Sequence, residues 1–124
     1  MLLLVVFAGG AAGALGRFVL SPLVQRRSRG PFPWGTLAVN LSGSLLLGLA
    51  VPVLSRYGAS AETTALVTVG LLGAFTTFST FAAETFALGV AERRIGAAAA
   101  YVFATLLLGL LAIAGGGAIA SSFL

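Results

Sequence analysis

GAFTTFSTF, residues 73–81, places four hydroxyl side chains and three phenyl rings in nine residues behind a leading glycine. The surrounding segment, about residues 63–90, is otherwise apolar enough to cross a bilayer. Glycine and threonine weaken a helix, and serine and threonine side chains compete for backbone carbonyls. We therefore expect the helix to break near residues 73–79. The alternative is an unbroken helix whose threonines bond back to its own turns.

A break of this kind matters because of the solvent that surrounds the chain. Of the 124 residues, 59% are hydrophobic and only 8% are charged, too few charges for a water-exposed surface. Lipid must therefore surround most of the chain, and broken helices at membrane depth are tolerated only where they line a cavity or hold an ion. There is no cysteine or histidine, which excludes disulfides, thiolate and imidazole metal sites, and histidine-based catalysis.

Four apolar blocks divide the chain. Each is about 20 residues or longer, the length that a helix needs to cross the hydrocarbon core, and each is continuous rather than alternating. The first block lacks a basic leader and contains Arg17, so we interpret it as a retained span and not as a signal peptide. The sequence predicts an all-α integral membrane protein, a single domain over 1–124 with four transmembrane helices per subunit, the third broken near its middle. The expected spans are about 2–22, 36–54, 63–90 and 96–121.

The net charge of +4 comes from arginines at the ends of the apolar runs. This placement is typical of membrane-flanking charges, so we expect no nucleic acid partner. The first and third loops carry Arg26, Arg27, Arg29, Arg93 and Arg94, whereas the second loop carries only Arg56. The positive-inside rule then places the first and third loops in the cytoplasm. We expect the protein to be a multi-pass protein of the inner (plasma) membrane.

Polar residues inside the spans are the candidates for function, since they are costly in lipid. Thr36, Asn40 and Ser44 recur every four residues and share one helical stripe. The Asn40 amide could hold an anion by donating hydrogen bonds, or it could join two spans; the residue alone leaves both open. In the fourth span, Tyr101 and Thr105 could extend a polar track, or Tyr101 could be an interface anchor.

Phe78 and Phe81 offer a second kind of anion contact. The edge of a phenyl ring is positive, so rings presented edge-on could line a path without trapping the ion on a full charge. Phe75 is assigned to packing. Arg17 could snorkel to the interface or raise the anion concentration at a pore mouth, and Glu84 is expected to be a structural hydrogen-bonding partner. No acid–base dyad or nucleophile–base pair is visible, so an enzyme is not expected.

Three motifs now carry a resemblance. GGAAGALGR (9–17), GTLAVNLSGS (35–44) and GAFTTFSTFAAE (73–84), in this order, resemble the Fluc (CrcB) family of fluoride channels. The resemblance covers essentially the whole chain, and the third motif is its most specific part. It implies a fluoride-selective channel that exports toxic fluoride from the cytoplasm, built as an antiparallel dimer with two pores.

The resemblance also implies roles for individual residues. Asn40 would be the pore asparagine, and Phe78 and Phe81 the pore-lining phenylalanines. By their place in the motifs, further residues would form a polar track: Thr36, Ser79 or Thr80, and, from span four, Tyr101 and Thr105. The backbone carbonyls of Gly73 and Thr76 from both subunits would hold one structural sodium ion. Arg17 would lie in the vestibule of the pore. Gly109, one turn beyond Thr105, supplies no hydroxyl to that track.

The dimer leaves one choice. An antiparallel homodimer requires insertion in both orientations, which the loop charge bias opposes. The family resemblance favours the homodimer, and an oppositely oriented paralogue is the alternative partner.

A small four-span dimeric drug or cation antiporter is the competing function, but span one contains no carboxylate for proton exchange.

Overall fold

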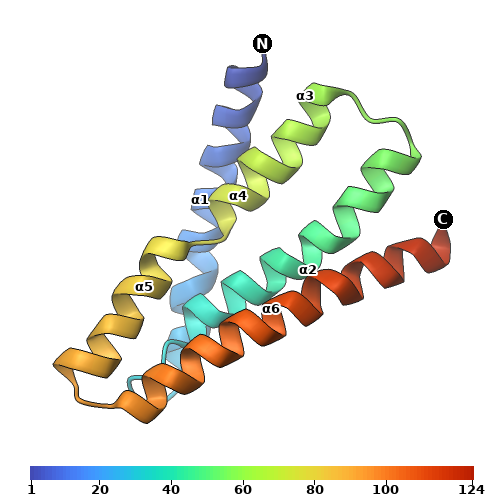
Figure 1. Ribbon diagram of the computed structural model, residues 1–124. Helices are drawn as coiled ribbons and strands as arrows, with labels where there is room; N and C mark the ends of the chain where they lie inside the picture. Colours follow the sequence, from blue (N-terminus) through green and yellow to red (C-terminus); the bar gives the residue numbers. More distant parts are fainter.

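The computed structural model describes all 124 residues, as helices joined by short turns (Figure 1). Four helical segments are long and apolar enough to cross a membrane, which confirms the predicted all-α architecture. The third is divided into short pieces, some with the wider turns of a π-helix (η). The elements are α1 (Leu2–Arg27), α2 (Trp34–Arg56), α3 (Ala61–Thr64), η1 (Ala65–Leu72), α4 (Gly73–Phe75), α5 (Phe78–Phe86), η2 (Ala87–Ala91) and α6 (Ile95–Phe123).

The first helix is longer than expected. It continues past Pro22 to Arg27, whereas the expected span stopped at residue 22. Proline removes one backbone donor and so costs one helical hydrogen bond, a loss that helices in membranes tolerate. The second helix likewise runs through Pro52 to Arg56. Proline is therefore not a stop signal in either helix.

The third span breaks where the sequence predicts. Thr76 and Thr77 have extended backbones, with ψ of 160° and 120°, between the end of α4 and the start of α5. Thr77 caps the second half, because its hydroxyl accepts a hydrogen bond from the backbone N–H of Thr80 at 3.2 Å. Figure 1 shows a short non-helical step between α4 and α5 at this point. The unbroken-helix alternative is therefore wrong.

The spans pack mainly as two pairs, α2 with α6 and α1 with η1 and α4. Glycine makes each pairing close. A Cβ on Gly48 would overlap the backbone of Ile113, and a Cβ on Gly13 would overlap that of Leu71. Small residues allow this approach in lipid, where packing rather than water expulsion holds helices together. The α5 segment belongs to neither pair and has far less contact with the rest of the chain.

Most large apolar side chains lie on the outside. Only 17 of the 124 residues are buried, so the apolar composition does not form a large internal core. The principal core cluster consists of Leu37, Phe81, Leu88, Ala98 and Tyr101. The remaining apolar surface is suited to lipid or to another subunit.

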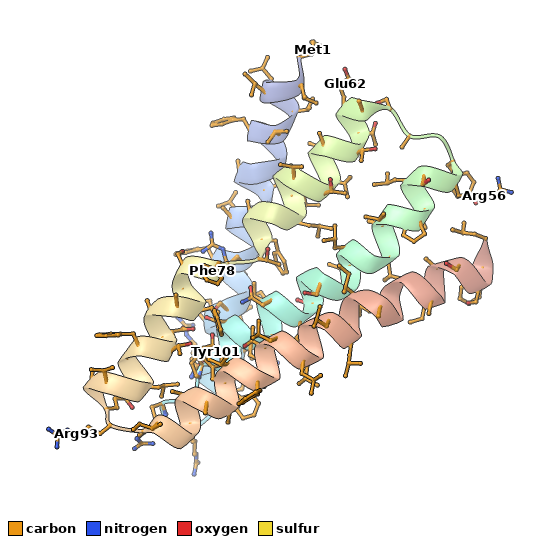
Figure 2. The ribbon with its side chains drawn as sticks, in the orientation of Figure 1. Met1, Arg56, Glu62, Phe78, Arg93 and Tyr101 are labelled. Atoms are coloured by element: carbon orange, nitrogen blue, oxygen red, sulfur yellow. The ribbon has the colours of Figure 1, made fainter.

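Both termini lie at one end of the molecule, together with the turn that follows Arg56 (Figures 1 and 2). Arg93, in the last turn, lies at the other end (Figure 2). This arrangement matches four consecutive crossings and keeps Arg56 apart from Arg93 and its loop.

Candidate functional site

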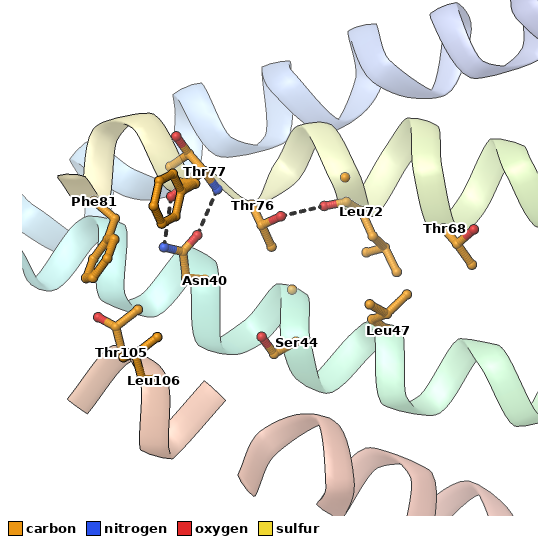
Figure 3. A pocket seen from close by; sticks show the side chains of 13 residues that line it. Asn40, Ser44, Leu47, Thr68, Leu72, Thr76, Thr77, Phe81, Thr105 and Leu106 are labelled. Atoms are coloured by element: carbon orange, nitrogen blue, oxygen red, sulfur yellow. Dashed lines mark hydrogen bonds between the residues drawn. The ribbon is translucent and has the colours of Figure 1, made fainter. Parts of the chain in front are cut away.

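The Asn40 side chain holds the break in the third span (Figure 3). Its Nδ2 donates to the carbonyl of Thr77 at 3.1 Å, and the N–H of Thr77 donates to its Oδ1 at 2.8 Å. Two peptide groups that the break frees are thus paired through one amide. The interhelical bond considered for Asn40 therefore exists, and it uses one of the two N–H groups on Nδ2. The other N–H leaves the anion role open.

Gly43 allows α2 to come this close to the break. A Cβ at this position would overlap the Thr76 methyl group and lie 3.2 Å from the Phe75 ring. The packing role expected for Phe75 agrees with this contact. Gly43 lies one turn beyond Asn40, so the same stretch of α2 supplies both the amide and the space that it needs.

A cavity of about 290 Å³ lies beside this junction, between α2, α6 and the third span (Figure 3). It brings together four of the predicted pore residues, Asn40, Phe78, Phe81 and Thr105, and both predicted sodium ligands, Gly73 and Thr76. Its lining contains no charged residue. The Thr105 hydroxyl is buried and has no hydrogen-bond partner. The cavity therefore offers neutral polar groups between apolar walls.

Phe78 and Phe81 lie near each other, with ring centroids 5.9 Å apart. Their surroundings differ. Phe81 is 8% exposed and packs against Tyr101, whereas Phe78 is 79% exposed at the start of α5. Phe78 therefore projects from the surface of the chain.

Glu84 gathers two of the predicted track hydroxyls. Thr36 donates to its Oε1 at 2.9 Å, and Tyr101 donates to its Oε2 at 2.7 Å. Thr36 and Tyr101 are 3% and 0% exposed, so the carboxylate is held by buried donors from α2 and α6. This agrees with the structural role expected for Glu84. The interface-anchor alternative for Tyr101 is wrong, because the side chain is fully buried.

Arg17 lies at a second, smaller cavity of about 190 Å³, which Thr36, Thr77 and Thr80 also line. Its Nε donates to the carbonyl of Ala74, in α4, at 3.2 Å. Arg17 thus turns towards the break, a contact that tests neither the snorkelling nor the pore-mouth role. Nine of the eleven predicted site residues therefore line one of these two cavities, whereas Ser79 and Tyr101 line neither. Thr77, which was not among them, lines both cavities.

Ser79 lines neither cavity and is exposed. Its hydroxyl lies 3.4 Å from that of Thr77, and no other side chain bonds to it. Of the two residues considered for this position of the track, Thr80 is the one that borders a cavity.

The carbonyls of Gly73 and Thr76 lose their regular helical donors at the break. In a continuous helix, the N–H groups of Thr77 and Thr80 would bond to them. Instead, the N–H of Thr77 donates to Asn40, and that of Thr80 donates to the Thr77 hydroxyl. Two backbone oxygens are thereby left for other partners, and carbonyl oxygens are ligands that a hard cation accepts.

Thr77 is the residue that the sequence interpretation missed. It caps α5, bonds to Asn40 and borders both cavities. The signal was present, since threonine is one of the residues that helices favour at the N-cap.

The whole chain also resembles known proteins. The family model described as "CrcB-like protein, Camphor Resistance (CrcB)" matches residues 4–117. Three relatives are each named "Fluoride-specific ion channel FluC". The protein from Bacteroides fragilis is 40% identical over 95% of this chain and 94% of its own length. Those from Hahella chejuensis and Thermus thermophilus are 42% and 44% identical over 92% and 86% of this chain, and 90% and 85% of their own lengths.

These relatives are ion channels by name, which agrees with the expectation that the chain is not an enzyme. Together with the four spans, the match indicates a multi-pass protein of the bacterial cell membrane. Because the family model covers nearly all of the sequence, the chain belongs to the CrcB-like protein family.

Proposed function

We propose that this chain is a fluoride-selective ion channel that lowers cytoplasmic fluoride by passive export across the cell membrane. The observation that carries the proposal is the cavity beside the broken third span. It holds an asparagine amide with one N–H to spare, an unpaired threonine hydroxyl and a pair of phenyl rings. Relatives that match almost the full chain bear the name of a fluoride channel.

Neutral donors suit conduction of a small anion. Asn40 and Thr105 can replace part of the hydration shell of fluoride without the full positive charge that would trap it. The positive ring edges of Phe78 and Phe81 add weak attraction. The negative charge of Glu84 lies outside this cavity, and both of its oxygens accept hydrogen bonds from buried hydroxyls. Arg17, at the second cavity, raises the local concentration of anions.

An antiparallel second copy completes the pathway in this proposal. The support is the exposed position of Phe78 and of Gly73, both of which border the cavity at the surface of one subunit. A partner that covers them would close the path from lipid. The chain has no cysteine, so a single cysteine introduced at the exposed Tyr57, in the second loop, can be labelled cleanly. Labelling from both sides of the membrane supports the homodimer, and labelling from one side only supports an oppositely oriented paralogue.

A structural sodium ion fits the same junction. Its ligands would be the carbonyls of Gly73 and Thr76 from both subunits, the two carbonyls whose helical donors are diverted. When bound, the ion would neutralise these carbonyl dipoles at the subunit contact. Asn40 and the Thr77 hydroxyl fix the backbone that presents the carbonyls.

The cellular role can be tested in a bacterium that has lost its own fluoride exporter. Expression of the chain should restore growth in millimolar fluoride, because passive export keeps the internal concentration low. The matched control is the chain with Asn40→Ala, expressed to the same level in the membrane. The proposal fails if the intact chain gives no more protection than an empty vector.

A further inference from the structure

Ser44 is a polar residue that the proposed pathway has not yet used. It lies one turn beyond Asn40 on the polar stripe of α2 and lines the 290 Å³ cavity (Figure 3). Its hydroxyl makes no hydrogen bond within the protein. This is unusual, because serine and threonine inside helices commonly bond to a carbonyl of the preceding turn.

The other hydroxyls nearby follow that habit. Ser42 donates to the carbonyl of Ala38 at 2.7 Å, Thr68 to that of Thr64 at 2.8 Å, and Thr76 to that of Leu72 at 3.1 Å. Of the five serines and threonines that line the cavity, only Ser44 and Thr105 have hydroxyls that bond to no protein group. These two come from different helices.

The Ser44 hydroxyl lies next to Gly109, a position on α6 that has no side chain. Gly109 lies one turn beyond Thr105 on α6, where a polar track from that helix would need its next hydroxyl. A Cβ built on Gly109 would lie 3.7 Å from the Ser44 Oγ, in ordinary contact. The α2 hydroxyl therefore lies beside the position from which α6 offers no side chain.

We propose that Ser44 is a further fluoride-binding residue, which supplies from α2 the hydroxyl that α6 lacks at Gly109. This rests on the proposed channel function. Residues four apart on a helix are separated by about 6 Å along its axis, so Ser44 follows Asn40 at the distance of one step along the path. The hydroxyl donates its proton to the anion without adding charge, and a weak neutral site of this kind allows the ion to leave again.

The test compares Ser44→Ala with Ser42→Ala in liposomes loaded with fluoride. Ser42 is the matched control, because it lies on the same helix and its hydroxyl bonds to its own turn. One hydrogen bond to an ion changes an equilibrium by about tenfold or more, and water in the cavity replaces part of it. We therefore expect S44A to lower the initial efflux rate per folded protein about three- to tenfold, and S42A to leave it unchanged.

A second variant separates the hydroxyl from its helix. In S44A/G109S, a serine on α6 returns a hydroxyl to the same place, so most of the lost rate should return. The proposal is overturned if S44A has the efflux rate of the intact chain, or if S42A loses as much of that rate as S44A. It is also overturned if S44A/G109S is as slow as S44A. The intact chain is measured first: if it passes no fluoride, the channel function itself fails, whereas a conducting chain with an unaffected S44A removes only the role of Ser44.

Discussion

Replacing Asn40 with alanine should destabilise the protein, because it removes the two hydrogen bonds that join α2 to the broken span; we call this pair of bonds the clasp. The amide makes hydrogen bonds of 2.8 and 3.1 Å to the N–H and carbonyl of Thr77. A buried donor or acceptor left without a partner costs about 1–3 kcal/mol. Both groups border a cavity that water can enter, so we take the lower part of this range for each. The expected loss is about 2–4 kcal/mol of unfolding free energy.

The loss can be measured by titrating the purified protein with a denaturing detergent and following its helical signal. Ser42→Ala is the control on the same helix, and it should stay within about 0.5 kcal/mol of the intact chain. The folded fraction of Asn40→Ala should also pass fluoride more slowly, because one of the neutral donors is gone. An Asn40→Ala protein as stable as the Ser42→Ala control would refute the clasp.

Three further substitutions test the remaining parts of the site. Phe78→Ile or Phe81→Ile keeps apolar bulk but removes a ring edge, and should lower fluoride efflux about two- to tenfold while the protein still assembles; unchanged efflux in both would remove the ring-edge argument. Gly43→Ala forces a methyl group onto the Thr76 side chain and should cost about 1–3 kcal/mol of unfolding free energy; a neutral result would mean that α2 need not approach the break so closely. Glu84→Gln leaves one acceptor oxygen for two buried hydroxyl donors and should cost about 1–2 kcal/mol in the same titration, whereas full stability would show that the carboxylate is not needed to hold them.

Local chemistry in the sequence was enough to predict the break. Thr76 and Thr77 are extended because threonine hydroxyls can replace helical partners, as Thr77 does for the N–H of Thr80. The number of spans followed from length and apolarity alone. The residues of GAFTTFSTF were therefore sufficient to predict that the helix breaks within this stretch.

The partners across the break were beyond a sequence pattern. Asn40 meets Thr77 at a separation of 37 residues, and periodicity gives the face of a helix but not the helix that lies opposite. For the same reason the pattern did not show that Thr36 and Tyr101 share Glu84 as their hydrogen-bond acceptor. These contacts arise from the packing of α2 against α6 and the third span.

Helix ends were the other point of difference. Pro22 was interpreted as the end of the first span, but α1 continues to Arg27. From that expected end, snorkelling of Arg17 to the membrane interface was one of two interpretations. In the structure Arg17 bonds to the carbonyl of Ala74, beside the break. The direction of the Arg17 side chain follows the carbonyl of Ala74 in the neighbouring span, and a sequence pattern does not show which carbonyl lies opposite.

The most direct test of the account is passive efflux from liposomes that contain the purified protein and a potassium ionophore to balance the charge. Efflux is measured with electrodes selective for fluoride and for chloride. In the absence of any proton gradient, liposomes loaded with fluoride should empty rapidly through the protein, while liposomes loaded with chloride should retain nearly all of it. This result would support a fluoride-selective channel and exclude a proton-coupled antiporter. If folded protein releases no fluoride, or releases chloride as readily, the central claim is contradicted.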